Sequence, residues 1–213
     1  MSTENEILLK IITIGNTAVG KTSIIKRYVY SIFEKDKMST IGINFAFKDI
    51  VLKNGKKVKL KLIDTAGQEK YRSLSKSYFK NTDGVLFVFS LDNLESFEKM
   101  SEWIDLYNEF NNDEKTPRYL IGNKCDLEPA VDDELIDKFL EKNANYIYKK
   151  TSAADNIGIN ELFEELAEKM FINYNKNGKQ KVEAILLNED NTKSNIKKHG
   201  GCGVCNLQEN ESN

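Results

Sequence analysis

The segment GNTAVGKT at residues 15–22 leaves few folds open to this chain. It matches the pattern G-x-x-x-x-G-K-[ST], and the apolar, β-branched residues 7–14 before it predict a strand. Residues 23–30 after it predict a helix. In such a unit, glycines let backbone N–H groups converge on phosphate oxygens, and the helix N-terminus adds partial positive charge. The sequence therefore predicts a phosphate-binding loop between a strand and a helix.

Two side chains of this loop have predicted roles of their own. Lys21 is expected to reach the β- and γ-phosphates of a nucleotide and to assist catalysis, and Thr22 to give its hydroxyl oxygen to Mg²⁺. The other predicted nucleotide-binding residues of this segment are Gly15, Asn16, Thr17, Ala18, Val19, Gly20 and Ser23. A glycine-rich turn without function is the alternative, and the strand and helix on either side disfavour it.

Strand patterns alternate with helix patterns up to about residue 172. Further strands are predicted at residues 45–52, 57–63, 85–89, 119–122 and 146–150, and further helices around residues 97–107, 135–140 and 159–170. Asn54-Gly55, between two of the strands, predicts a type I′ hairpin. The alternation favours a single α/β domain, with about six strands in a mostly parallel sheet and helices on both faces.

The composition divides the chain into two parts. Past about residue 173, Asn, Lys and Glu dominate and aromatic residues nearly vanish, which predicts a disordered tail. We therefore expect a nucleotide-binding domain at residues 1–172 and a tail at residues 173–213. The formal net charge is −2, so the basic excess typical of nucleic-acid binders is lacking, and we expect no nucleic-acid partner.

The cellular location follows from what the sequence contains and lacks. An odd count of 3 cysteines argues against a disulfide framework and for a reducing compartment. No apolar run is long enough to span a bilayer, and the first residues, MSTENE, do not resemble a signal peptide. We expect a cytoplasmic protein whose membrane contact, where there is any, is peripheral.

A second motif, DTAGQE at residues 64–69, follows a predicted strand. At that position, Asp64 can hold Mg²⁺ through water. The N–H of Gly67 can meet a γ-phosphate, and the amide of Gln68 can orient an attacking water, which makes Gln68 the second predicted catalytic residue. An ordinary polar loop is the alternative.

A third motif, NKCD at residues 123–126, points to the base of the nucleotide. The two carboxylate oxygens of Asp126 can accept from N1–H and N2–H₂ of guanine, whereas adenine would turn a lone pair toward them. Sites built this way discriminate by roughly 10⁴–10⁵. Lys124 can lay its stem over the base, while the backbone of Ser152 and Ala153 can donate to guanine O6. Asn123 completes the predicted base site, and a solvated turn or an ATP-dependent P-loop enzyme are the alternatives.

These three motifs, in this order and spacing, resemble the Ras superfamily of small GTPases over residues 6–172. Within it, TIGINF at residues 40–45 and YRSLSKSYF at residues 71–79 resemble Rab proteins. The resemblance implies slow hydrolysis of GTP to GDP, with Mg²⁺, in a switch for vesicle or endomembrane traffic. It also implies that Thr40 binds Mg²⁺ and γ-phosphate, and that Phe33 packs on the guanine edge. A Ras-like signalling GTPase, or a scaffold with negligible hydrolysis, is the alternative.

The partners are also implied by the resemblance. Effectors are expected to bind switch I, residues 37–45, and switch II, residues 64–80, of a monomer that an exchange factor and a GTPase-activating protein regulate. The chain departs from the Rab pattern at Ile63, where Rab proteins usually carry Trp. Lys37, Lys150 and Ala154 depart from it as well.

The tail departs from the Rab pattern at its end. Rab proteins usually carry prenylated cysteines at or near the C-terminus, whereas Cys202 and Cys205 are followed here by NLQENESN. No C-a-a-X ending exists, so the two cysteines are unmodified, acylated, or prenylated after trimming. Lipidation there would attach the protein to the cytosolic face of endomembranes. With His199, the cysteines could instead form part of a zinc site.

Overall fold

The computed structural model describes residues 7–35, 40, 42–65, 78–111 and 113–176. Its elements are β1 (Leu8–Ile14), α1 (Lys21–Tyr30), β2 (Ile43–Val51), β3 (Lys57–Thr65), β4 (Gly84–Ser90), α3 (Leu94–Glu98), α4 (Met100–Asn108), β5 (Arg118–Asn123), α5 (Asp133–Lys142) and β6 (Tyr146–Thr151). A further helix follows at residues 159–176, so it extends past the predicted domain limit at residue 172. No helix among the described residues is long and apolar enough to cross a membrane.

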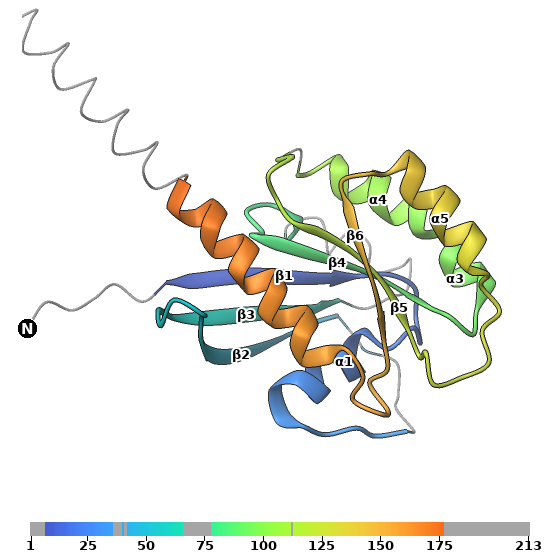
Figure 1. The fold of residues 1–213 in the computed structure, drawn as a ribbon, viewed down its shortest axis with the longest axis horizontal. Coiled ribbons are helices and arrows are strands. Elements are labelled where there is room, and N and C mark those ends of the chain that lie inside the picture. The colour runs from blue at the N-terminus through green and yellow to red at the C-terminus, as the bar shows by residue number, and fades with distance from the viewer. Residues whose placement is uncertain (1–6, 36–39, 41, 66–77, 112, 177–213) are drawn as a thin grey trace, which may run out of the picture. The chain divides into compact units, whose positions relative to one another are not determined.

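The strands form one six-stranded sheet in the order β2-β3-β1-β4-β5-β6. All neighbouring pairs are parallel except β2 with β3, which confirms the predicted mostly parallel sheet with one antiparallel hairpin. In Figure 1, α1 and the helix at 159–176 lie on one side of the sheet, and α3, α4 and α5 lie on the other. The fold is therefore the predicted α/β arrangement with both faces covered.

Each face of the sheet has its own hydrophobic core. Under α1 and the helix at 159–176, the rings of Tyr28 and Phe163 stack with their centroids 4.0 Å apart. Under α3 to α5, Trp103 and Tyr107 pack against the sheet. β4, between the two cores, is buried at every residue, as its continuous apolar sequence predicts.

The predicted type I′ turn at Asn54-Gly55 is wrong. That turn needs a positive φ at both central residues, and only Gly55 has one, at 80°. Instead, the Gly55 N–H donates to the Leu52 carbonyl at 2.8 Å, and the Leu52 N–H donates to the Lys56 carbonyl at 2.9 Å. The loop therefore has three residues, 53–55.

The register of the hairpin explains the longer loop. It pairs Ala46 with Leu62, and both side chains are buried. A two-residue loop would shift the pairing by one and place Leu62 opposite Phe47, which is 52% exposed. Burial of one face of the sheet therefore decides the turn.

The helix predicted around residues 97–107 is two helices, α3 and α4, separated by Lys99. The Asn93 side chain caps α3 by accepting from the Ser96 N–H at 3.0 Å. The apolar face is continuous across the break, because Phe97, Met100 and Tyr107 are all buried. The predicted face is thus confirmed, although the helix is interrupted.

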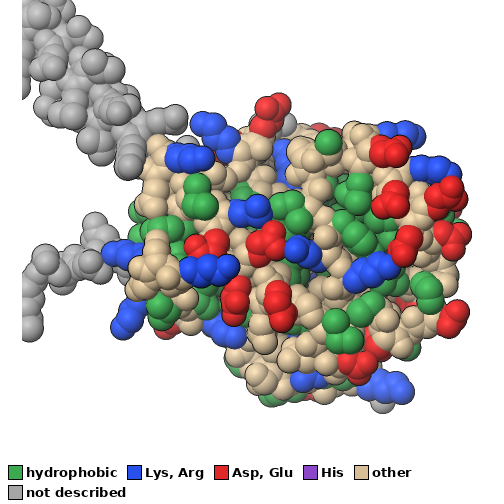
Figure 2. All heavy atoms as spheres, in the orientation of Figure 1, with side chains coloured by type: hydrophobic (Ala, Val, Ile, Leu, Met, Phe, Trp, Pro, Cys, Tyr) green, Lys and Arg blue, Asp and Glu red, His purple; other side chains and the backbone are tan. Residues whose placement is uncertain are grey.

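On the face of the molecule that Figure 2 shows, acidic and basic side chains are interspersed.

Candidate functional site

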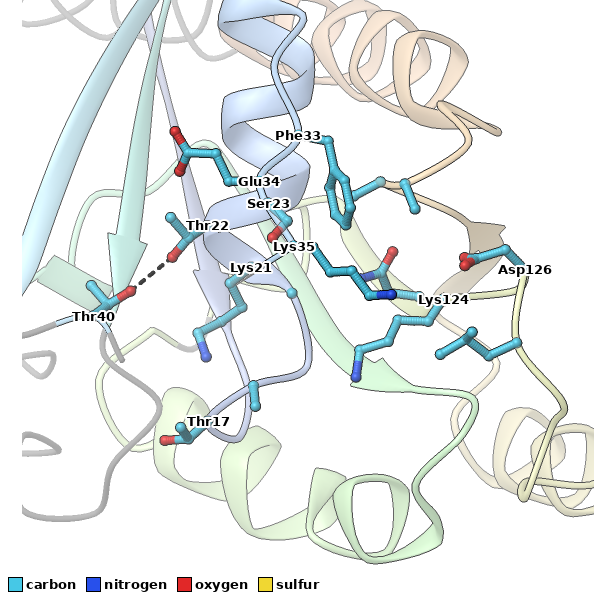
Figure 3. Close-up of a pocket in the computed structure, with 16 residues that line it drawn as sticks. Thr17, Lys21, Thr22, Ser23, Phe33, Glu34, Lys35, Thr40, Lys124 and Asp126 are labelled. Atoms are coloured by element: carbon cyan, nitrogen blue, oxygen red, sulfur yellow. Dashed lines mark hydrogen bonds between the residues drawn. The ribbon is translucent and has the colours of Figure 1, made fainter. Parts of the chain in front are cut away.

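A cavity of about 560 Å³ opens beyond the carboxyl ends of the parallel strands. In Figure 3, Thr22 and Thr40 lie at one end of the lining and Asp126 at the other. It is lined by Thr17, Ala18, Gly20, Lys21, Thr22, Ser23, Phe33, Glu34, Lys35, Thr40, Asn123, Lys124, Asp126, Leu127, Ala153 and Ala154. Residues from four segments of the chain therefore line one cavity.

The loop between β1 and α1 needs glycine at two places. A Cβ on Gly15 would come within 2.0 Å of the Val88 carbonyl oxygen, and one on Gly20 within 2.2 Å of the Asn123 side chain. Both glycines also have positive φ angles, 147° and 99°. The backbone can therefore turn tightly here and leave its N–H groups toward the cavity.

Lys21 is buried under this loop. Its Nζ donates to the carbonyl oxygens of Gly15 at 2.8 Å and Asn16 at 2.7 Å. Burial lowers the pKa of Lys21 to about 8, and the nearby charge of Asp64 opposes that change. An anion in the cavity would stabilise the charged ammonium, so the arrangement suits a phosphate group.

Three oxygen-bearing side chains meet at one end of the cavity. Thr22 Oγ1 donates to Asp64 Oδ2 at 2.7 Å and lies 2.8 Å from Thr40 Oγ1. Asp64 is 4% exposed at the carboxyl end of β3. Hard oxygen donors of this kind fit Mg²⁺, which is usually held by one or two protein oxygens together with water and phosphate.

The other end of the cavity is built around Asp126. Ser152 Oγ donates to Asp126 Oδ1 at 2.5 Å and accepts from the Asp155 N–H at 3.0 Å. Lys124 has a positive φ of 62°, and its Nζ lies 3.4 Å from Asp92 Oδ1. The loops after β5 and β6 thus hold one carboxylate and one ammonium at the mouth of the cavity.

The comparison with known families decides the identity of this fold. A model of the Ras family matches residues 10–172. The chain belongs to the Ras family. It is therefore a small GTPase, which binds guanine nucleotide and hydrolyses GTP.

This GTPase is also similar to several curated proteins. Human Ras-related protein Rab-7L1 is 36% identical over 170 residues, covering 78% of this chain and 84% of that protein. Human Ras-related protein Rab-32 is 33% identical over 199 residues, covering 90% and 88%. Ras-related protein Rab-10 of Diplobatis ommata is 38% identical over 165 residues, covering 76% and 81%. The resemblance to Rab proteins is thereby confirmed.

In this GTPase, Asn123 bonds to the loop after β1 and to the last residue of β6. Its Nδ2 donates to the Val19 carbonyl at 2.8 Å, and its Oδ1 accepts from Thr151 Oγ1 at 3.1 Å. Both ends of the amide are used within the protein, and Asn123 is 1% exposed. Asn123 therefore joins the loop between β1 and α1 to the end of β6.

The sequence analysis did not identify two residues whose side chains bond to the loops of the site. Trp103 is 2% exposed, and its Nε1 donates to Asn16 Oδ1 at 2.6 Å. Arg27 contacts the loop after β6. No motif marks these residues, because their partners lie far away in the chain. Gly67 and Gln68 lie outside the described residues, as do Cys202, Cys205 and His199.

Proposed function

We propose that this GTPase alternates between a GTP form that recruits effectors and a GDP form that releases them, in vesicle or endomembrane traffic. One observation carries the proposal: a single cavity has Lys21 and the Thr22–Thr40–Asp64 cluster at one end and Asp126 at the other. A nucleotide would bind with its phosphates at the first end and its base at the second.

At the phosphate end, Lys21 binds the β- and γ-phosphate oxygens, and the loop backbone from Gly15 to Thr22 donates to them. Thr22 and Thr40 would hold Mg²⁺ directly, and Asp64 would hold it through water. Mg²⁺ supplies neutralisation of phosphate charge when it is bound. Gln68 orients the attacking water with its side-chain amide.

At the base end, both oxygens of Asp126 accept from the N1–H and N2–H₂ of guanine. Ser152 Oγ donates to one of these oxygens and so fixes the carboxylate plane. Phe33 packs on the edge of the base, and Lys124 lies over its face. The backbone N–H of Ala153 donates to O6, whereas the Ser152 N–H donates to the Ile157 carbonyl at 3.0 Å.

The proposed switch acts by binding effector proteins. Thr40 Oγ1 lies 2.8 Å from Thr22 Oγ1, so one residue of the proposed effector segment lies at the phosphate end of the cavity. We expect effectors at residues 37–45 and 64–80, with an exchange factor and a GTPase-activating protein setting the ratio of the two forms of a monomer. The protein would be cytoplasmic, with peripheral attachment to endomembranes through Cys202 or Cys205.

Competition among nucleotides tests the proposal. Fluorescent GDP bound to the full chain is challenged with GTP, GDP or ATP, in Mg²⁺ and again with EDTA. We expect GTP and GDP to displace the probe, ATP to fail at a thousandfold higher concentration, and EDTA to speed release. Equal competition by ATP would show that Asp126 does not select guanine.

A further inference from the structure

One guanidinium group, that of Arg27 in the last turn of α1, joins two segments that border the cavity. Its Nε donates to the Ala153 carbonyl at 2.7 Å, and its Nη2 donates to the Ala154 carbonyl at 2.8 Å. These two carbonyls belong to the loop after β6 and are 126 and 127 residues away in sequence. Two parallel charge-assisted hydrogen bonds of this length fix a loop in both position and orientation.

The same group also reaches the segment after α1. Its Nη1 donates to the Ser31 carbonyl at 3.3 Å, and its central carbon lies 5.7 Å from the centroid of the Phe33 ring. That distance is within the range of a cation–π interaction. In Figure 3, Phe33 lies toward the Asp126 end of the cavity and away from Thr40.

Arg27 does not line the cavity, but the residues that it holds do. Ala153, Ala154 and Phe33 are all lining residues. Ser152, next to Ala153, donates to Asp126 at 2.5 Å, so a displaced loop would also turn the Asp126 carboxylate. Arg27 is thus linked to Asp126 in three steps. Its guanidinium bonds to the backbone of Ala153 and Ala154, the chain continues to Ser152, and Ser152 bonds to the carboxylate.

We infer that Arg27 is a positioning residue for guanine recognition, which holds the loop of residues 152–154 and the Phe33 segment in register around the base. The inference rests on the proposed guanine site. Because both segments depend on one side chain, a pull on residues 31–33 loosens the base loop as well. An exchange factor that moves the segment before switch I would therefore weaken base binding without touching Asp126.

The test compares GDP with IDP, which lacks the 2-amino group that Asp126 accepts from. Dissociation rates and affinities of both nucleotides are measured in excess Mg²⁺ for wild type, Arg27→Gln and Arg27→Lys. The matched control is Lys138→Gln, which removes the exposed pair with Glu134, 3.7 Å apart on α5, and changes no contact of a residue that lines the cavity. Thermal unfolding of the GDP-bound proteins separates lost stability from lost positioning.

We expect Arg27→Gln to release GDP about tenfold faster, the size of one lost charge-assisted hydrogen bond, and to narrow the preference for GDP over IDP. Arg27→Lys keeps the charge but not the planar fork, so it should fall between Arg27→Gln and wild type. Lys138→Gln should match wild type.

The outcomes distinguish this inference from the proposed function. A preference for GDP over IDP that is as large in both Arg27 variants as in wild type would overturn the positioning role, even with faster release or a lower melting temperature. A wild-type chain that binds GDP and IDP equally would overturn the guanine site, and this inference with it. Should Arg27→Gln fail to fold, Arg27→Lys decides the question alone.

Discussion

The two ends of the cavity are built in opposite ways. The phosphate end is mostly local, because the loop of residues 15–22 supplies its backbone and Lys21 bonds to carbonyls only 5 and 6 residues away. The base end is assembled from segments more than a hundred residues apart, joined by Asn123 and Arg27. A local site depends on one turn folding correctly, whereas an assembled site depends on the whole sheet.

The largest expected effect is at the base end. Asp126→Asn keeps an acceptor for N1–H but replaces the second acceptor by an NH₂ donor, which repels the N2–H₂ of guanine and matches the C2 carbonyl of xanthine. GTP affinity should therefore fall by roughly 10⁴, and preference should move toward xanthine nucleotides. Competition of GTP and XTP against a fluorescent nucleotide measures both changes. An Asp126→Asn protein that still prefers GTP would show that base selection lies elsewhere.

At the phosphate end, Gln68→Leu should separate chemistry from binding. An amide that acts only on the attacking water contributes in the transition state, so hydrolysis should fall by roughly 10²-fold or more while GTP affinity stays unchanged. Single-turnover hydrolysis with bound GTP measures the first quantity and nucleotide displacement the second. Unchanged hydrolysis would exclude the proposed role of Gln68.

The link between the two ends can be cut at Asn123. Asn123→Ala removes partners of the buried Val19 carbonyl and the buried Thr151 hydroxyl, which should cost about 2–3 kcal/mol in the free energy of unfolding. Urea unfolding of the GDP-bound protein provides the measurement. Faster GDP release without lost stability would instead place Asn123 in direct contact with the nucleotide.

The smallest effect is expected at the back of the phosphate loop. Asn16→Ala removes the acceptor of the Trp103 Nε1–H and should cost about 1 kcal/mol in the free energy of unfolding. Because Trp103 is the only tryptophan of the chain, its emission reports the change directly. Emission that is identical in Asn16→Ala and wild type would mean that the two side chains are not joined in solution.

Sequence alone predicted the elements whose cause is local. The periodicity of residues 159–170 marked a helix, and the continuous apolar run at residues 85–89 marked a strand buried on both faces. It erred at Asn54-Gly55, where the burial pattern of two whole strands sets the loop length. It also missed the break at Lys99, because an apolar face can continue across a helix end.

The same division holds within the site. The sequence by itself predicted the phosphate loop, the acidic residue at the end of β3 and the carboxylate of the base loop, because each lies in a short motif whose chemistry needs those residues in that order. Only the tertiary structure decided that Asn123 joins the loop after β1 to the end of β6, that Trp103 bonds to Asn16, and that Arg27 bonds to the loop after β6. Hydrogen bonds between residues far apart in the chain form only when the folded sheet brings the partners together, so no local sequence pattern predicts them.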